Sequence, residues 1–135
     1  MGTNTSIACL VLALALASVS HAAAPEWSEL ADLETVEVIS SDEGGGQRLT
    51  TVWIVVLDHQ AYVRTGGTRW GDNVEREGKL RLRVPKGEYA LRAEKVLSAA
   101  EVESVEAAFA EKYGSSDWWA GLMRFGETRV FRLLE

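Results

Sequence analysis

Residues 62–70 combine two arginines, two threonines and two aromatic residues around a pair of adjacent glycines, in the order Tyr-Val-Arg-Thr-Gly-Gly-Thr-Arg-Trp. An arginine guanidinium offers planar, bidentate donors to a phosphate group. Threonine hydroxyls and glycine N–H groups add neutral donors, and an aromatic ring can cover a planar ring system. The cluster would therefore suit a small ligand that carries a phosphate and an aromatic ring.

The charge balance of the chain bears on how these arginines are interpreted. There are 14 Lys and Arg against 20 Asp and Glu, a formal net charge of −6, so general basicity does not explain Arg64 and Arg69. The same acidic balance argues against a nucleic-acid or anionic-membrane surface. One alternative stays open on the residues alone: the two arginines are surface residues that pair with Glu75 and Glu77, and Trp70 is part of the core.

The N-terminal segment has the pattern of an export signal. The uncharged apolar run over residues 7–19 suits a signal-peptide h-region and is too short for a bilayer, which takes about 20 apolar residues. Small residues three apart then offer cleavage after Ala22 or Ala24. We expect residues 1–24 to be a signal peptide and residues 25–135 to be one domain. The mature protein should be periplasmic or secreted, with no membrane contact after cleavage.

Cleavage would also remove most of the reactive side chains. The single cysteine, Cys9, and one of the two histidines, His21, lie in this segment. Disulfides, thiolate nucleophiles and cysteine metal sites are then excluded from the mature domain. His59 alone cannot form a histidine-rich metal site or a His-centred triad. We expect no metal, and we expect His59 to lie in an exposed turn.

Alternating and β-branched segments predict about six strands, joined mostly by turns of hairpin length. They lie at residues 34–39, 48–57, 61–65, 79–84, 89–96 and 128–134. The strand at 48–57 is apolar on both faces and should be central. Residues 66–78 read as a loop leading into one or two helical turns. Ser98 and Glu101 predict a capping box for a helix that stops at Gly114. The expected fold is mainly β, a small antiparallel barrel with one capped α-helix before the last strand.

This order of elements resembles the FMN-binding split barrel of the pyridoxamine-phosphate-oxidase-like superfamily. Within it, the chain is most similar to a group of small bacterial proteins with a domain of unknown function. The likeness is carried by residues 51–58, 61–70, 79–84, 89–96 and 129–133, and by the helix ending at Gly114. The resemblance implies a split β-barrel and a homodimer that binds a flavin or deazaflavin, such as FMN, in a groove between protomers.

The resemblance also implies which residues hold the cofactor. The phosphate ligands would be basic and hydroxyl side chains of the second strand and of the segment from the third strand into the loop after it. They are Arg48, Thr50, Arg64, Thr65, Thr68 and Arg69. Tyr62 or Trp70 would pack on the ring. The family's lysine near the end of the second strand is absent here, where Val55, Val56 and Leu57 stand.

The function expected on this basis is that of an exported flavin- or deazaflavin-binding oxidoreductase-like protein of unknown substrate. The alternative is a non-catalytic exported module. It would use the same groove for a small ligand or for haem, or use its tryptophans for a protein partner. Flavin absorbance bands in the purified protein would separate the two.

Overall fold

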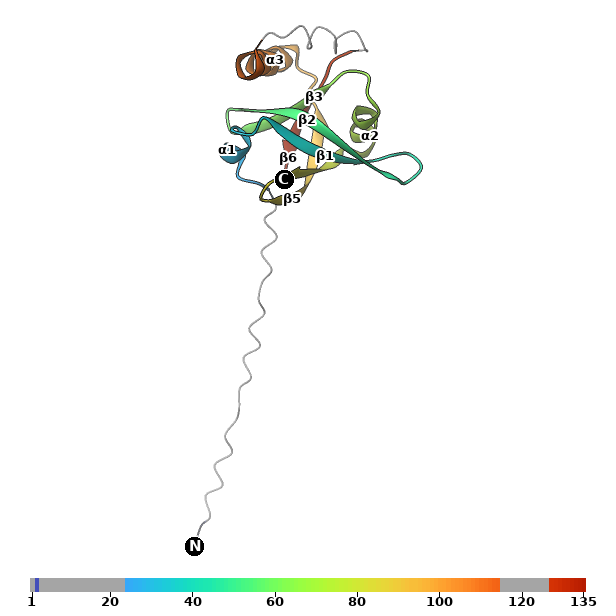
Figure 1. The fold of residues 1–135 in the computed structure, drawn as a ribbon, viewed down its shortest axis with the longest axis vertical. Helices are drawn as coiled ribbons and strands as arrows, with labels where there is room; N and C mark the ends of the chain where they lie inside the picture. Colours follow the sequence, from blue (N-terminus) through green and yellow to red (C-terminus); the bar gives the residue numbers. More distant parts are fainter. Residues whose placement is uncertain (1, 3–23, 115–126) are drawn as a thin grey trace.

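The computed structural model describes residues 24–114 and 127–135, and also Gly2. Nearly all of the signal peptide predicted for residues 1–24 lies outside the described residues. The helices and strands are α1 (Trp27–Leu30), β1 (Thr35–Ser41), β2 (Gln47–Leu57), β3 (Gln60–Thr65), α2 (Arg69–Glu77), β4 (Lys79–Val84), β5 (Gly87–Lys95), α3 (Ala99–Tyr113) and β6 (Arg129–Leu134). Figure 1 shows the strands wrapped into a barrel with α3 packed against its outside, while Trp70 and Val74 of α2 belong to the interior apolar cluster.

The six strands form one closed barrel in the order β1-β2-β3-β6-β5-β4. Every neighbouring pair is antiparallel, and β1 closes the barrel on β4 through the pairs from Glu37↔Arg83 to Ile39↔Arg81. The predicted fold is confirmed: a mainly β, antiparallel barrel with a helix before its last strand. The predicted strands and the capped helix agree with the observed bounds to within two residues.

The expectation that β2 is buried on both faces holds only for its second half. Ile54 and Val55 are 0% and 2% exposed, whereas Leu49 is 53% exposed. The reason is that the β1–β2 hairpin extends beyond the barrel, so its outer part has no third layer to cover it (Figure 1). Apolar residue types alone do not reveal where a hairpin leaves the body of the protein.

Two apolar clusters lie on opposite faces of the sheet, because successive side chains of a strand point to opposite sides. The first fills the barrel and includes Val63 and Phe131. The second lies outside the barrel, where Val105 and Phe109 of α3 pack on the outer face of β2, β3 and β6. These two helix residues are four positions apart and therefore share one face of the helix. Thus β3 sends Val63 inward and Tyr62 outward.

The last turn of α3 is tied to the backbone of the segment before β1 and of β2. The Lys112 ammonium donates to the carbonyl oxygens of Leu33 at 2.6 Å and Ile54 at 2.7 Å. The Tyr113 hydroxyl donates to the Glu34 carbonyl at 2.7 Å and accepts from the Ile54 N–H at 3.1 Å. Burial lowers the pKa of Lys112 and raises the pKa of Tyr113. We call these contacts the backbone clasp of α3.

Candidate functional site

The predicted site residues fall into three groups. The first group lies at the end of β3 and the start of α2 and consists of Thr65, Thr68, Arg69 and Trp70. The second lies on the outer face of β3 under α3 and consists of Tyr62 and Arg64. The third lies on β2 toward the β1–β2 hairpin and consists of Arg48 and Thr50. The structure therefore brings only part of the set together. We call the connection over residues 65–69 the β3–α2 turn.

The β3–α2 turn places two hydroxyl groups at the N-terminus of a helix. Thr68 is the N-cap of α2 in extended backbone, and its Oγ1 accepts from the N–H of Gly71 at 3.3 Å. The Oγ1 atoms of Thr65 and Thr68 are 2.6 Å apart, so one hydroxyl donates to the other. The N–H groups of the first helical residues have no acceptor within the helix, and this end of a helix favours negative charge.

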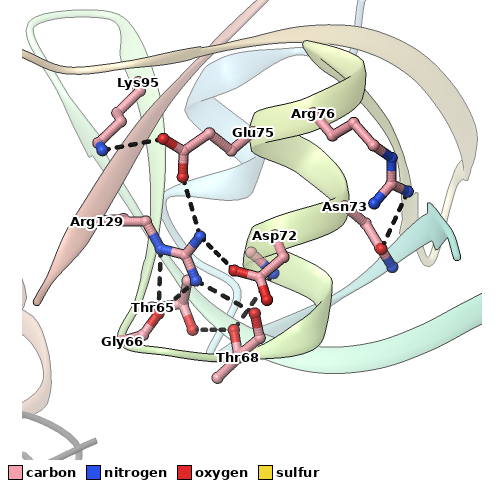
Figure 2. Close-up of polar contacts among 10 residues, drawn as sticks. Thr65, Gly66, Thr68, Asp72, Asn73, Glu75, Arg76, Lys95 and Arg129 are labelled. Atoms are coloured by element: carbon pink, nitrogen blue, oxygen red, sulfur yellow. Dashed lines mark hydrogen bonds and ion pairs between the residues drawn. The ribbon is translucent and has the colours of Figure 1, made fainter. Parts of the chain in front are cut away.

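Arg129 of β6 holds this turn from the inside (Figure 2). Its side chain is buried, and its Nε and Nη2 donate to the Gly66 carbonyl at 3.2 and 2.7 Å. Nη2 also donates to the Thr68 carbonyl at 3.2 Å, while Nη1 forms ion pairs with Asp72 at 2.9 Å and Glu75 at 3.0 Å. One guanidinium therefore links the last strand, the turn and two turns of α2.

Sequence reasoning placed Arg129 only as a residue of the closing strand. The sequence does indicate the direction of its side chain: Arg129 is two and four positions before Phe131 and Leu133, whose side chains face the interior, so it lies on the same face of the strand. An arginine at such a position needs buried partners. The register of β6 on β3 sets Arg129 opposite Thr65, and this long-range pairing could not be read from local patterns.

Arg69 is the exposed cation of the turn. It is the first residue of α2, and within residues 24–114 and 127–135 its guanidinium makes no hydrogen bond or ion pair. It borders a groove of about 350 Å³ whose lining also includes Asp42, Asn73 and Arg76. An arginine beside a helix N-terminus that makes no hydrogen bond or ion pair with the described residues is suited to an incoming anion.

Arg48 is engaged by the hairpin rather than by the turn. Its Nε and Nη2 donate to the two carboxylate oxygens of Asp42 at 2.9 and 3.2 Å. The Asn73 amide donates to Ser40 at 3.1 Å and to Asp42 at 2.8 Å, which ties α2 to the hairpin. The hydrogen bond from Arg48, and then that from Asn73, hold the pKa of Asp42 below its usual value. Thr50 is half-buried on β2, where it pairs with β1.

Arg64 lies under α3 and not beside Arg69. It is 8% exposed, and its guanidinium carbon is 3.9 Å from the centre of the Phe109 ring, a cation–π contact. Burial lowers the pKa of Arg64 to about 9, against the opposing effect of Glu106. The expectation that Arg64 and Arg69 bind one phosphate is therefore corrected, because the outer face of β3 at Arg64 is covered by a helix.

The two predicted ring-packing residues are also part of the protein's own packing. Trp70 is 5% exposed and its ring centre is 6.2 Å from that of Phe131, so it is a core residue, as the alternative interpretation had it. Tyr62 is 6% exposed, and its hydroxyl donates to Glu101 at 2.8 Å. The alternative also paired the arginines with Glu75 and Glu77; among the described ion pairs, Glu75 binds Arg129 and Lys95, and Glu77 binds Arg76.

Comparison with protein families gives a match over most of the chain. A family model described as an uncharacterized protein conserved in bacteria, DUF2255, matches residues 26–130. A comparison with curated proteins found no match.

Solved structures share the fold at low sequence identity. HutZ, the heme storage protein from Vibrio cholerae, aligns with a TM-score of 0.62 at 18% identity, over 83% of this chain and 89% of that chain. A putative pyridoxamine 5'-phosphate oxidase from Listeria innocua gives 0.58 at 11% identity, over 79% and 87%. A FAD-binding protein from Mesorhizobium loti gives 0.56 at 13% identity, over 78% and 81%. These likenesses confirm the split-barrel fold of the pyridoxamine-phosphate-oxidase-like type.

Proposed function

The chain belongs to the DUF2255 family of uncharacterised bacterial proteins, and on that premise we propose that it binds a flavin through a phosphate group at the β3–α2 turn. The observation that carries the proposal is Arg69, an exposed arginine at the start of α2 whose guanidinium makes no hydrogen bond or ion pair with the described residues, although its charge helps to lower the pKa of Asp42. The fold supports it, because proteins with the same fold include one described as FAD-binding.

The residues of the turn fit the phosphate end of such a ligand. The Arg69 guanidinium would supply charge-assisted, bidentate hydrogen bonds. The N–H groups of the first turn of α2 would add neutral donors, and the helix dipole favours the negative charge. The Thr68 hydroxyl accepts from the Gly71 N–H and is paired with the Thr65 hydroxyl. When Thr65 donates that bond, Thr68 accepts twice and its own proton is available to a phosphate oxygen.

Tyr62 and Trp70 cannot pack on the flavin ring, because both side chains are buried in this protomer. We propose that a second copy of the chain completes the site, in a homodimer with the ligand between protomers. The exposed Leu49 on the outer face of β2 supports an apolar contact there. Light scattering should give the mass of two chains, and a mass of one chain with FMN bound would contradict the dimer.

The chemistry of the bound group would be electron transfer by the flavin ring, while the protein binds and orients it. This oxidoreductase-like role belongs to the proposal, and the structure names no substrate. The proposed location, periplasmic or secreted, rests on the apolar run over residues 7–19. Among the described residues, no helix is long and apolar enough to cross a membrane. N-terminal sequencing of exported protein should begin at Ala23 or Pro25, and a start at Met1 would contradict signal cleavage.

The test is a titration with FMN and with riboflavin, which lacks the phosphate. Losing one charge-assisted phosphate contact costs about 1.5–3 kcal/mol, which corresponds to roughly ten- to a hundred-fold in affinity. Arg69→Ala should therefore weaken the affinity for FMN by that factor and leave the affinity for riboflavin unchanged. Lys79→Ala is the matched control, because Lys79 is also an exposed cation without a partner in the described part of the chain. No FMN binding by the wild-type protein would overturn the proposal.

A second candidate is haem binding without catalysis, favoured by the likeness to HutZ, which is described as a heme storage protein. His59, exposed in the β2–β3 turn with φ of 61°, is the histidine that the described residues offer as an axial ligand. Haem titration that gives a Soret band lost in His59→Ala, without flavin binding, would favour this candidate.

A further inference from the structure

Helix α2 carries two carboxylates, in its first two turns, that would repel an anion at the β3–α2 turn. Asp72 is in the first turn of the helix and Glu75 in the next, and their side chains are 67% and 42% exposed. Acidic residues here stabilise the helix through its dipole, but a bound phosphate would meet two like charges. A phosphate site at this helix end therefore needs a compensating positive charge.

Arg129 supplies that charge from the interior. Its Nη1 forms ion pairs of 2.9 and 3.0 Å with Asp72 and Glu75, and only 10% of its side chain is exposed. Lys95 makes a second ion pair with Glu75 at 3.1 Å. The hydrogen bond from Arg129, and then that from Lys95, hold the pKa of Glu75 below its usual value. Both carboxylates thus face the guanidinium and are neutralised where a ligand would approach.

The same guanidinium orients the donors of the turn. Its bonds to the carbonyl oxygens of Gly66 and Thr68 add to the backbone bonds that these oxygens accept from Thr68 and Asp72, and together they fix the direction of both carbonyls. In a trans peptide the N–H of the next residue points opposite to the carbonyl. The N–H groups of Gly67 and Arg69 therefore point away from Arg129. Gly67 and Arg69 are both exposed residues.

We propose that Arg129 is the positioning residue that makes the β3–α2 turn selective for a phosphorylated flavin over riboflavin. This inference rests on the proposed function and adds the residue that sets the selectivity. Arg129 touches no ligand. It orients the N–H groups of the turn and cancels the charge of Asp72 and Glu75.

The test compares FMN and riboflavin affinities of single and double variants. Arg129→Gln removes the positive charge, and FMN affinity should fall about ten-fold while riboflavin affinity stays the same. Adding Asp72→Asn to Arg129→Gln should restore part of the FMN affinity, because the exposed carboxylate is removed. A purely structural role for Arg129 would lower both affinities together, and Asp72→Asn would then restore neither. That result would overturn the inference.

Asp72→Asn alone provides a variant in which Arg129 and the turn stay intact, should Arg129→Gln fail to fold. This variant should bind FMN at least two-fold more tightly than the wild-type protein, because the substitution leaves an excess of positive charge at Arg129. Glu103→Gln is the matched control, since Glu103 is an exposed carboxylate on α3. Unchanged FMN affinity in Asp72→Asn would overturn the inference. Equal wild-type affinity for FMN and riboflavin would also overturn it and leave flavin binding standing, whereas no flavin binding at all would overturn the proposed function as well.

Discussion

Arg129 packs so closely on Gly71 that a Cβ atom at position 71 would lie 2.7 Å from Nη2 of the arginine. The same Cβ would lie 2.6 Å from the Cγ2 atom of Thr65. Real Cβ atoms do not approach other atoms this closely, so one of the three residues would have to move. The absence of a side chain at Gly71 is what lets the arginine, the strand end and the helix meet.

Gly71→Ala should therefore destabilise the protein, although alanine is the better helix former. We expect a loss of about 1–3 kcal/mol, typical of overpacking, measured by urea denaturation. FMN affinity should fall as well, because displacing Arg129 disturbs the turn. Gly44→Ala is the control, since a Cβ atom there meets nothing within 4 Å. Unchanged stability of Gly71→Ala would mean that Arg129 can adopt another position at no cost.

Arg64→Ala should behave differently from Arg69→Ala. Arg64 lies under α3 on the Phe109 ring, so its loss should cost about 1 kcal/mol or more of folding stability. Its effects on FMN and on riboflavin should be equal. Arg83→Ala is the control, because Arg83 is a half-exposed arginine of β4 far from this contact. A loss of FMN affinity alone, with stability unchanged, would show that the phosphate reaches Arg64.

The contacts of Glu101 predict a change of stability with pH. The hydrogen bond from Arg132, and then that from Tyr62, lower the pKa of Glu101 from its ordinary value of 4.5. A carboxyl whose pKa is lower in the folded state stabilises the fold above the unfolded pKa, and this stabilisation is lost as the pH falls through the folded pKa. Thermal denaturation should therefore show falling stability below about pH 4.5. Glu101→Gln should be less stable at neutral pH and lose part of this slope, and an unchanged slope would contradict the assignment.

The start of α3 offers a test of the helix cap. The Ser98 Oγ accepts from the Glu101 N–H at 3.3 Å, as the sequence predicted. The reciprocal half of the predicted capping box does not form, because the Glu101 carboxylate accepts from Tyr62 and Arg132 instead. Ser98→Ala should cost about 1 kcal/mol, read from the denaturation midpoint. Ser98→Asp keeps an acceptor and should retain most of the stability, and equal losses in both variants would rule out capping.

The barrel and its capped helix could be predicted from the sequence because strand alternation and helix caps are local patterns. The site could be predicted only in part. Thr65 and Thr68 do meet at a helix start, but alternation does not say which face of β3 carries α3. Arg64 was therefore assigned to the ligand when it belongs under the helix. Arg129 was missed because its partners lie more than 50 residues earlier in the chain.

The backbone clasp of α3 has a consequence for how freely the sequence can vary. Lys112 and Tyr113 contact carbonyl oxygens and an N–H group, not side chains, of Leu33, Glu34 and Ile54. Every amino acid presents a carbonyl oxygen, and every one except proline presents an N–H, so these particular bonds do not depend on the side chains at the three positions, whereas the stacking of Tyr113 on the Trp53 ring does need its partner side chain. The clasp is therefore asymmetric: replacing Lys112 or Tyr113 removes its side-chain groups, and α3 then depends on the packing of Val105 and Phe109.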